Sequence, residues 1–569
     1  MAIARLCNIP HTRVIPYRKC TQQDGLYKRV GIKSPSSLHQ RREIMNSTTP
    51  RAFRAQHVLA ATSLLWLAGC GGGNDAGTAM QASTAAQACS TLSGKTVGGA
   101  TLTTVVVPAN GAAPTYCKVN GTVAPKLNFE IRLPNAWNGK LHYAGGGGYN
   151  GSIPDVAFSI NALRQGYATA SSDSGHQGNM LDASFALDDA NAARLFGHLS
   201  VPTVMSTSIE TVKAAYGQLP TKSYYEGCSN GGREGLMAVQ RNPTLFDGVI
   251  ARAPAYNWVG FMGAFNRNAK ALAAPGGALS PAKTALLAKS VRDACDGLDG
   301  IVDGLVSNQA ACTPAAFNPA SLRCAGGADL GDSCLSDAQL NFVSAWTSDA
   351  AFDGSATYRN AGWSLTGNED SPTGLALWVT GAGTVTNSLQ FLFQDTTVKN
   401  YLARNPRADS LAYTPWDQNV QALNNMAVLN DATNADIRSF ANRGAKLILW
   451  HGSNDAALSK NSTVEYYNKV VTTLGGQAAA EAFMRFYVAP GVDHCAGGPG
   501  ADTADLLTAL DNWVMREAPP GNLTAQKLDS TTGAVQFERP LCQHPKYPHY
   551  TGPANDSQAA KLAVNYACR

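Results

Sequence analysis

Three features are missing from this chain of 569 residues. Its 13 cysteines include no Cys-x-x-Cys pair, so they lack the usual spacing of a structural zinc site. The net charge of +5 does not come from a basic domain, because residues 1–56 hold eleven Lys or Arg against two acids. The rest of the chain carries 34 basic and 38 acidic residues, and nothing there indicates nucleic-acid binding. The apolar stretch from His57 to Leu67 is too short to span a membrane.

The chain does contain the motif of a nucleophilic serine. Gly227, Ser229 and Gly231, within YYEGCSNGGREG, form the pattern G-x-S-x-G. In this motif the serine lies on a strained turn between a strand and a helix. The flanks fit, because residues 222–228 are typical of a short strand and residues 233–241 of a helix. An ordinary glycine turn is the alternative in a chain with 55 glycines.

Two later stretches predict the partners of this serine. Residues 445–450 (AKLILW) have the pattern of a buried strand and lead into a loop with Asp455. Residues 483–488 (FMRFYV) have the same pattern and lead into a loop with His494. The order Ser229, Asp455, His494 is that of α/β-hydrolases. We therefore predict a catalytic triad of these three residues, in which His494 is the base and Asp455 orients it.

Other acidic and basic candidates fit less well. Asp493 adjoins His494, but neighbouring side chains diverge along an extended loop. His451 and His176 are alternative bases, and His451 lies only four residues from Asp455. Neither lies in the loop after the last predicted strand, where the base is expected.

A glycine stretch predicts the oxyanion hole. Residues 140–144 are strand-like and lead into Gly145 to Gly148. The second oxyanion donor of α/β-hydrolases lies after such an early strand, and the first is the amide that follows the nucleophile. We therefore expect the amides of Asn230 and Gly148 to bind the oxyanion. A mobile turn is the alternative for the glycine stretch.

The spacing of the strand-like segments indicates the domain organisation. About 190 residues separate the apolar stretch 246–253 from Ala445, far more than a crossover helix needs. We predict the α/β class and an α/β-hydrolase fold with a large inserted lid domain. The catalytic domain would comprise residues 89–255 and 440–569, and the lid domain residues 256–439.

The N-terminal region has the features of an export signal. After Met45 come Arg51 and Arg54, then the short apolar stretch and the sequence LAGC, which resembles a bacterial lipobox. We expect residues 1–70 to be a leader and signal peptide, with Cys70 lipidated and residues 71–88 a flexible tether. Ordinary secretion and a start site placed too early remain alternatives. An exported chain would be a periplasmic, secreted or outer-membrane lipoprotein.

Two cysteines adjoin the predicted triad. Cys228 precedes Ser229 and Cys495 follows His494, so a disulfide between them would link the two catalytic loops. An oxidising compartment favours such a bond, and chain entropy rewards the closure of a long loop. Two unrelated buried thiols are the alternative.

Several of these motifs together resemble one family. GCSNGGREG, HGSND, DHC and GGGGYNG are similar to segments of the tannase and feruloyl esterase family, which also includes hydrolases of mono(2-hydroxyethyl) terephthalate. The resemblance runs from about Cys89 to the C-terminus. The cysteines beside the serine and the histidine are its most distinctive mark. Together with proximity in the sequence, the resemblance also suggests four further disulfides: Cys89 with Cys117, Cys295 with Cys312, Cys324 with Cys334, and Cys542 with Cys568.

The resemblance implies a calcium ion in the lid. The segment DGLDGIVDGL supplies the carboxylates of Asp296, Asp299 and Asp303, and Ile301 and Leu305 would offer carbonyl oxygens. This spacing is not that of an EF-hand. A series of Asp-Gly turns without metal is the alternative. The ion would be structural, because the segment is not part of the triad.

The predicted lid also carries aromatic residues suited to a planar acyl group, namely Trp363, Trp378, Phe391, Phe393 and Trp416. Most such residues are lid core. Trp378 is the best candidate for substrate contact, because it resembles the lid tryptophan of the family. Terephthalate monoester hydrolases of the family use a lid arginine, and the 17 residues after Trp378 contain none.

These observations predict an exported serine esterase that hydrolyses small esters of aromatic carboxylic acids of the feruloyl or galloyl type. One alternative is a mono(2-hydroxyethyl) terephthalate hydrolase. Another is a surface lipoprotein that binds aromatic ligands without catalysis. The oligomeric state and the preferred acyl and alcohol groups are left open.

Overall fold

The computed structural model describes residues 84–352, 357–413, 416, 419–554 and 556–569. The predicted leader, the signal peptide, Cys70 and most of the tether therefore lie outside the described residues. Within the part of the chain that is described, no helix is both long and apolar enough to cross a membrane.

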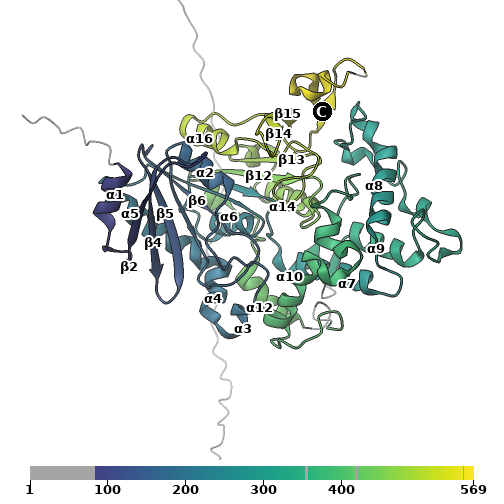
Figure 1. Ribbon diagram of the computed structural model, residues 1–569, viewed down its shortest axis with the longest axis horizontal. Helices are drawn as coiled ribbons and strands as arrows, with labels where there is room; N and C mark the ends of the chain where they lie inside the picture. The colour runs from purple at the N-terminus through teal and green to yellow at the C-terminus, as the bar shows by residue number, and fades with distance from the viewer. Residues whose placement is uncertain (1–83, 353–356, 414–415, 417–418, 555) are drawn as a thin grey trace, which may run out of the picture. The chain divides into compact units, whose positions relative to one another are not determined.

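A mixed sheet of nine strands forms the centre of the described fold (Figure 1), in the order β13-β12-β9-β8-β6-β7-β5-β4-β3. Its strands are β3 (Thr103–Val107), β4 (Tyr116–Val123), β5 (Leu127–Pro134), β6 (Lys140–Ala144), β7 (Ala168–Ser172), β8 (Lys222–Cys228), β9 (Gly248–Arg252), β12 (Lys446–Gly452) and β13 (Met484–Ala489). The six strands from β7 to β13 are parallel, whereas β5, β4 and β3 pair in antiparallel fashion. The strand order reverses around β6, and in open α/β sheets ligands bind at such a switch point.

Both faces of the sheet are covered by helices. One face packs against α1 (Ala85–Leu92), α5 (Ser200–Tyr216), α6 (Asn230–Arg241) and α14 (Lys460–Thr473), and the other against α2 (Ala157–Arg164) and α16 (Leu506–Arg516). Neighbouring residues of β8 alternate between the two cores, with Tyr225 on the first face and Tyr224 on the second. Burial on both faces explains why β9, β12 and β13 are almost continuously apolar.

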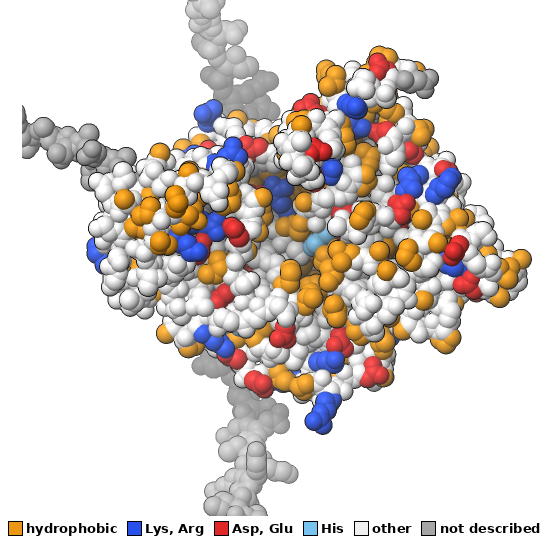
Figure 2. Space-filling model, viewed as in Figure 1, with side chains coloured by type: hydrophobic (Ala, Val, Ile, Leu, Met, Phe, Trp, Pro, Cys, Tyr) orange, Lys and Arg blue, Asp and Glu red, His pale blue; other side chains and the backbone are white. Residues whose placement is uncertain are grey.

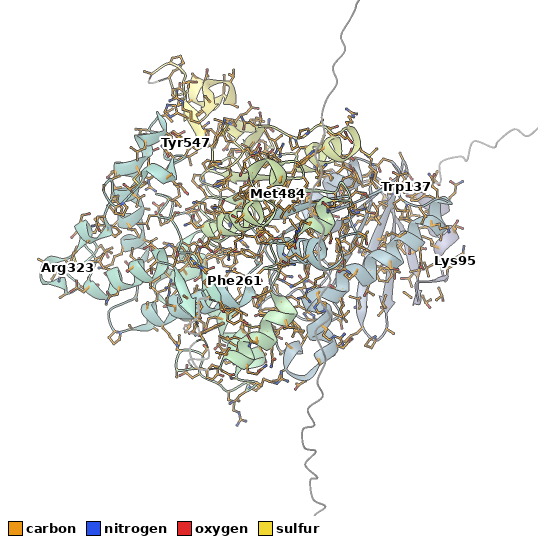
Figure 3. The ribbon with its side chains drawn as sticks, turned by 180° about the vertical axis from the view of Figure 1, so that it is seen from behind. Lys95, Trp137, Phe261, Arg323, Met484 and Tyr547 are labelled. Atoms are coloured by element: carbon orange, nitrogen blue, oxygen red, sulfur yellow. A yellow bond between two sulfur atoms is a disulfide. The ribbon has the colours of Figure 1, made fainter. Side chains whose placement is uncertain are left out.

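Residues 256–439 are called the insert below. Most of their buried apolar side chains belong to a second hydrophobic cluster, which they share with residues outside the insert such as Tyr149, Phe196 and Leu458, and their described part adds no strand to the nine-stranded sheet. The main elements are α7 (Trp258–Ala273), α8 (Pro281–Cys295), α9 (Asp337–Thr347), β10 (Ala350–Phe352), β11 (Tyr358–Asn360), the π-helix η6 (Ala376–Thr380), α10 (Leu389–Thr397), the π-helix η9 (Val398–Leu402) and α12 (Val420–Asn430). Seen from behind, Phe261 of α7 lies centrally, whereas Arg323 marks the outer part of the insert, away from Lys95 and Trp137 (Figure 3).

Shorter elements connect these parts. They include β1 (Thr96–Val97), β2 (Ala100–Thr101), α3 (Phe185–Asp188), α4 (Ala190–Arg194), η1 (Leu195–Leu199), η2 (Asp296–Asp299), η3 (Gln309–Ala311), η4 (Pro319–Leu322), η5 (Ala325–Gly327), η7 (Gly381–Gly383), η8 (Val385–Asn387), α13 (Arg438–Ala441), α15 (Gln477–Glu481), β14 (Leu523–Leu528), β15 (Val535–Leu541), β16 (Pro548–Tyr550), η10 (Ala559–Lys561), η11 (Ala563–Asn565) and β17 (Tyr566–Cys568).

The α/β class and the central sheet confirm the predicted fold class. Strand β4 was not predicted, because its sequence YCKVNGTV mixes polar residues and a glycine into the strand pattern. The tertiary structure explains the glycine. A Cβ atom on Gly121 would lie 2.5 Å from the ring of Phe129 on β5, so only glycine fits.

All five disulfide pairings named from the sequence are present in the structure. The bond between Cys228 and Cys495 joins the end of β8 to the loop after β13, with 5.9 Å between the two Cα atoms. It connects positions 267 residues apart, directly beside Ser229 and His494.

Candidate active site

Ser229 lies on the sharp turn between β8 and α6. Its φ of 62° and ψ of −123° fall outside the regions that a serine normally adopts, as expected of a nucleophile elbow. The two glycines of the motif are needed because the chain passes close to itself. A Cβ on Gly227 would lie 2.6 Å from the carbonyl carbon of Gly231, and a Cβ on Gly231 would lie 2.6 Å from the oxygen of Gly146.

Asp455 and His494 are joined by a hydrogen bond. Asp455 lies in the loop after β12, and its Oδ2 accepts from Nδ1 of His494 at 2.7 Å. Its Oδ1 accepts the backbone N–H groups of Ala457 and Leu458, both at 2.8 Å. Burial would raise the pKa of Asp455, but His494, His451 and these hydrogen bonds together hold it well below its usual range. The ionised carboxylate can only accept hydrogen bonds, so Nδ1 of His494 donates to it and Nε2 takes no part in this bond.

Ser229 and His494 line one pocket of about 310 Å³, together with Asn230, Gly148 and Trp378. The structure therefore brings together the predicted nucleophile, base, oxyanion donors and lid tryptophan, and Asp455 joins them through His494. The space-filling view shows a hollowed surface in which a histidine is exposed beside hydrophobic side chains (Figure 2).

Five aromatic rings and one methionine form the wall of the pocket on the side of the insert. We call this set the ring wall: Trp258, Phe261, Met262, Phe265, Trp378 and Phe393. Trp378 places its ring edge to face with that of His494, with 4.9 Å between the centroids. Its plane is within 8° of that of Phe393, at a centroid distance of 6.2 Å. Trp378 thus contacts both the predicted base and the ring wall.

Four members of the ring wall were missed by the sequence analysis. Trp258, Phe261, Met262 and Phe265 occupy positions i, i+3, i+4 and i+7 of α7, so one face of this helix points into the pocket. That spacing was visible in the sequence. It did not identify a binding surface, because the same pattern marks any helix that packs on a core.

The other predicted lid aromatics lie elsewhere. Trp363 stacks on Trp346 with 4.2 Å between the ring centroids, and Trp416 packs against Phe352. Both belong to the core of the insert. Of the five aromatics named from the sequence, Trp378 and Phe393 are the two that line the pocket with Ser229.

The alternative acid and bases have other partners. His451 is buried, and its Nε2 lies 3.1 Å from both Asp455 Oδ2 and the oxygen of Leu458, so it donates toward the carboxylate that also holds His494. His176 stacks on Phe185 at 3.7 Å. Asp493 accepts from Ser371 at 2.5 Å and also from Thr373 and Asn454. The side chain of Asp493 therefore ties the loop of His494 to the insert.

Gly148 lies where only glycine fits. Its φ is 54°, and a Cβ atom would meet the backbone oxygen of Met180 at 2.4 Å. The backbone of Gly148 lines the pocket, as does Asn230, the first residue of α6. One of the two predicted oxyanion donors therefore lies at the start of α6 and the other in the glycine stretch, and both residues line the pocket of Ser229.

The acidic segment around η2 carries the predicted calcium ligands. Burial raises the pKa of Asp299 to about 7, and burial also raises that of Asp303, which Arg539 partly offsets with a hydrogen bond of 2.6 Å. These hard oxygens suit calcium. Among the described residues, however, no three His, Cys, Asp or Glu side chains are grouped closely enough to hold a metal ion. A calcium ion here would need backbone carbonyls, such as those of Ile301 and Leu305.

Comparison with known proteins shows which family this chain resembles. The family described as tannase and feruloyl esterase matches residues 110–568. Over 524 residues the chain is 32% identical to a mono(2-hydroxyethyl) terephthalate hydrolase of Piscinibacter sakaiensis, covering 80% of this chain and 85% of that protein. It is 27% identical to a probable feruloyl esterase of Arthroderma benhamiae, covering 79% and 84%. The crystal structure of feruloyl esterase B from Aspergillus oryzae has a similar fold, with a TM-score of 0.70, 24% identity and coverage of 82% and 96%.

Proposed function

The chain belongs to the tannase and feruloyl esterase family, a family of carboxylic ester hydrolases, and we propose that it is a serine esterase acting on esters of aromatic carboxylic acids. One observation carries this proposal. Ser229 and the Asp455-bound His494 line the same pocket, and aromatic rings form its opposite wall.

The proposed reaction uses these groups in two steps. His494 Nε2 takes the proton of Ser229 as Oγ attacks the ester carbonyl, and Asp455 stabilises the imidazolium that forms. The N–H groups of Asn230 and Gly148 bind the oxyanion. The imidazolium then returns the proton to the departing alcohol, leaving an acyl group on Ser229. Water attacks this acyl-enzyme by the same route and releases the acid.

The ring wall supports an aromatic acyl group. Apart from His494, no described residue that lines the pocket can carry a charge. The nearby polar side chains of α7 and α10 bond to one another, as Asn266 does to Gln394 at 2.8 Å. A planar, uncharged ring would bury its surface here, and a good ring contact adds about 1 kcal/mol beyond burial. The insert would then act as the lid of the pocket.

Hydrolysis of a terephthalate monoester is the second candidate, and the 32% identity to such an enzyme favours it. The free carboxylate of that substrate would enter a pocket that no described Lys or Arg side chain lines. Leaving a charged group unpaired in such surroundings costs several kcal/mol. We therefore favour uncharged aromatic acyl groups.

The test is a kinetic comparison of methyl esters with purified protein that begins after Cys70. Methyl 4-methylbenzoate and monomethyl terephthalate differ only in a methyl group against a carboxylate, and methyl ferulate and methyl gallate complete the set. We expect Ser229→Ala to abolish all turnover and Ser208→Ala, a buried serine on α5, to leave it intact. A terephthalate rate equal to that of its methyl counterpart would favour the second candidate. Turnover by Ser229→Ala would remove the proposed mechanism.

We also propose a structural calcium ion held by Asp296, Asp299 and Asp303 together with the carbonyl oxygens of Ile301 and Leu305, and the buried side chains of Asp296 and Asp299 support it. Calcium should raise the melting temperature of chelator-treated protein, whereas magnesium should raise it less. Asp299→Asn should reduce this response without changing the rate of ester hydrolysis. An unchanged melting temperature in calcium would exclude the site.

Export and a lipid anchor at Cys70 remain proposals from the leader sequence. In a bacterial host, the full chain should separate with the membrane fraction, and Cys70→Ala should release it to the soluble fraction. Equal distribution of both proteins would contradict lipidation.

A further inference from the structure

One buried carboxylate is bonded to both loops that supply the proposed oxyanion donors. Glu234 lies on α6, five residues after Ser229, and is 5% exposed. Its Oε2 accepts the backbone N–H of Gly146 at 3.2 Å, within the glycine loop (Gly145 to Gly148). Its Oε1 accepts the side-chain amide of Asn230 at 3.1 Å. Glu234 therefore joins segments that are more than 80 residues apart in the sequence.

The same carboxylate also holds the far end of the glycine loop. Asn150, two residues after Gly148, donates its side-chain amide to Glu234 Oε1 at 2.7 Å. Hydrogen bonds at Gly146 and Asn150 thus bracket Gly148 on both sides. On α6, Arg233 donates to Asn230 Oδ1 at 2.7 Å, so the side chain of Asn230 is bonded through both its oxygen and its nitrogen.

The two loops touch each other closely, so the position of one depends on the other. A Cβ on Gly145 would lie 2.0 Å from the hydroxyl of Tyr225 and 2.9 Å from the Cα of Gly231. The Tyr225 hydroxyl itself lies 2.7 Å from Gly231 O and 3.2 Å from Glu234 Oε2. A carboxylate suits this place because both its oxygens accept hydrogen bonds here, whereas a carboxamide accepts at only one.

We propose that Glu234 is a positioning residue that sets the separation between the backbone amides of Asn230 and Gly148, and thereby the fit of the oxyanion hole to the transition state. It does not touch the substrate. The proposal rests on the function proposed above, because the oxyanion hole has a role only if Ser229 is the nucleophile. Oxyanion donors act by preorganised geometry, so small displacements reduce the rate without weakening the binding of the ground state.

The test is Glu234→Gln, which keeps the shape of the side chain but replaces one accepting oxygen with an NH₂ group that donates. We expect kcat for methyl 4-methylbenzoate to fall by about 10- to 100-fold, with KM changed by less than about threefold. Phenylboronic acid forms a tetrahedral adduct with a catalytic serine and mimics the transition state, so its inhibition constant should rise by the factor by which kcat/KM falls. Benzamide occupies only the ring pocket, so its inhibition constant should stay the same.

Two further variants keep the inference open to contradiction. Glu130→Gln is a matched control, since Glu130 is 6% exposed and bonded to Arg132 on β5, far from the elbow in the strand order. It should lower the melting temperature and leave kcat unchanged. Asn230→Ala removes one contact of Glu234 but keeps the backbone amide. In the double variant with Glu234→Gln, kcat should fall by less than the product of the two single-variant factors.

The outcomes separate this inference from the function on which it rests. If Ser229→Ala is inactive but Glu234→Gln keeps full kcat and unchanged inhibition by phenylboronic acid, the role of Glu234 is wrong and the proposed function stands. Equal weakening of boronic acid and benzamide overturns it too, because that indicates general damage to the pocket. If Glu234→Gln does not fold, Asn230→Ala takes its place. Weaker inhibition by phenylboronic acid with unchanged inhibition by benzamide supports the positioning role, and any other result contradicts it. Activity in Ser229→Ala contradicts the proposed function itself.

Discussion

On the sheet side of the pocket, Asp455, His494 and Asn230 are held by side-chain hydrogen bonds, whereas the aromatic rings of the ring wall opposite are held mainly by packing. Asp455 accepts bonds from two histidines and two backbone amides, and Asn230 is fixed by Arg233 and Glu234. Trp378 and Phe393, by contrast, meet the pocket through ring contacts. Directional bonds fix the atoms that react, and apolar surfaces select the size and shape of what they react with. The two sides should therefore respond differently to substitution.

The largest effect is expected on the sheet side, at Asp455. Asp455→Asn keeps the shape but no longer stabilises the imidazolium of His494, and we expect kcat to fall by about 10⁴-fold. Asp493→Asn is the matched control, since its carboxylate accepts from Ser371, Thr373 and Asn454 and not from His494. In this variant kcat should fall by less than about tenfold. Steady-state kinetics with one methyl ester compare both variants, and equal losses would show that His494 depends on either acid.

The next effect concerns the disulfide between the loops that carry Ser229 and His494. Replacing Cys228 and Cys495 by serine removes a bond that closes a loop of 267 residues, worth roughly 2–5 kcal/mol. We expect a lower melting temperature and a large loss of activity, because Ser229 and His494 adjoin these cysteines. Replacing Cys324 and Cys334, 10 residues apart in the insert, should leave activity intact. Full activity of the variant without Cys228 and Cys495, or of protein treated with mild reductant, would mean that the disulfide is not needed to hold the triad.

On the ring wall, Trp378→Ala should change selectivity more than chemistry. We expect kcat/KM for methyl 4-methylbenzoate to fall by about 10- to 100-fold and that for 4-nitrophenyl acetate by less than about threefold, because the small acyl group needs no ring contact. Trp363→Ala, in the core of the insert, should lower stability and leave the ratio of the two rates unchanged. A uniform loss on both esters would assign Trp378 to the positioning of His494 instead.

The smallest expected effect is a loss of stability at acidic pH. Burial lowers the pKa of His176 to about 4, and this ring stacks on Phe185 among the aromatic side chains next to the pocket. Below the pKa of about 6.5 in the unfolded chain, the unfolded state binds a proton that the folded state does not. Stability should therefore be complete above pH 6.5 and fall as the pH drops toward 4. We expect a decrease of a few degrees in the melting temperature.

The variant His176→Phe isolates this contribution. It should show a shallower decrease with acid but not a flat profile, because burial also lowers the pKa of His544 to about 4. Thermal melts of both proteins at pH 4.5, 5.5 and 6.5 make the comparison. Parallel profiles would show that His176 does not contribute to the acid sensitivity.

The sheet side was largely predictable from the sequence, whereas only Trp378 and Phe393 of the ring wall were named from it. Strand patterns located β6, β8, β12 and β13 to within two residues, because strands buried on both faces are short apolar runs that end at polar or glycine residues. The triad candidates follow such strands directly. The rings of α7 and the second histidine on Asp455 were not assigned, since helical spacing and a nearby histidine fit a plain core equally well.

The sequence by itself determined the α/β fold class, the order of Ser229, Asp455 and His494, and the glycines that the elbow requires, because these depend on local backbone geometry and on motifs a few residues long. Only the tertiary structure decided that Glu234 joins the glycine loop to Asn230, that Asp493 holds the insert while Asp455 holds His494, and that one face of α7 lines the pocket. Those contacts join residues tens to hundreds of positions apart. They form only when the packed sheet brings the ends of separate strands to one edge.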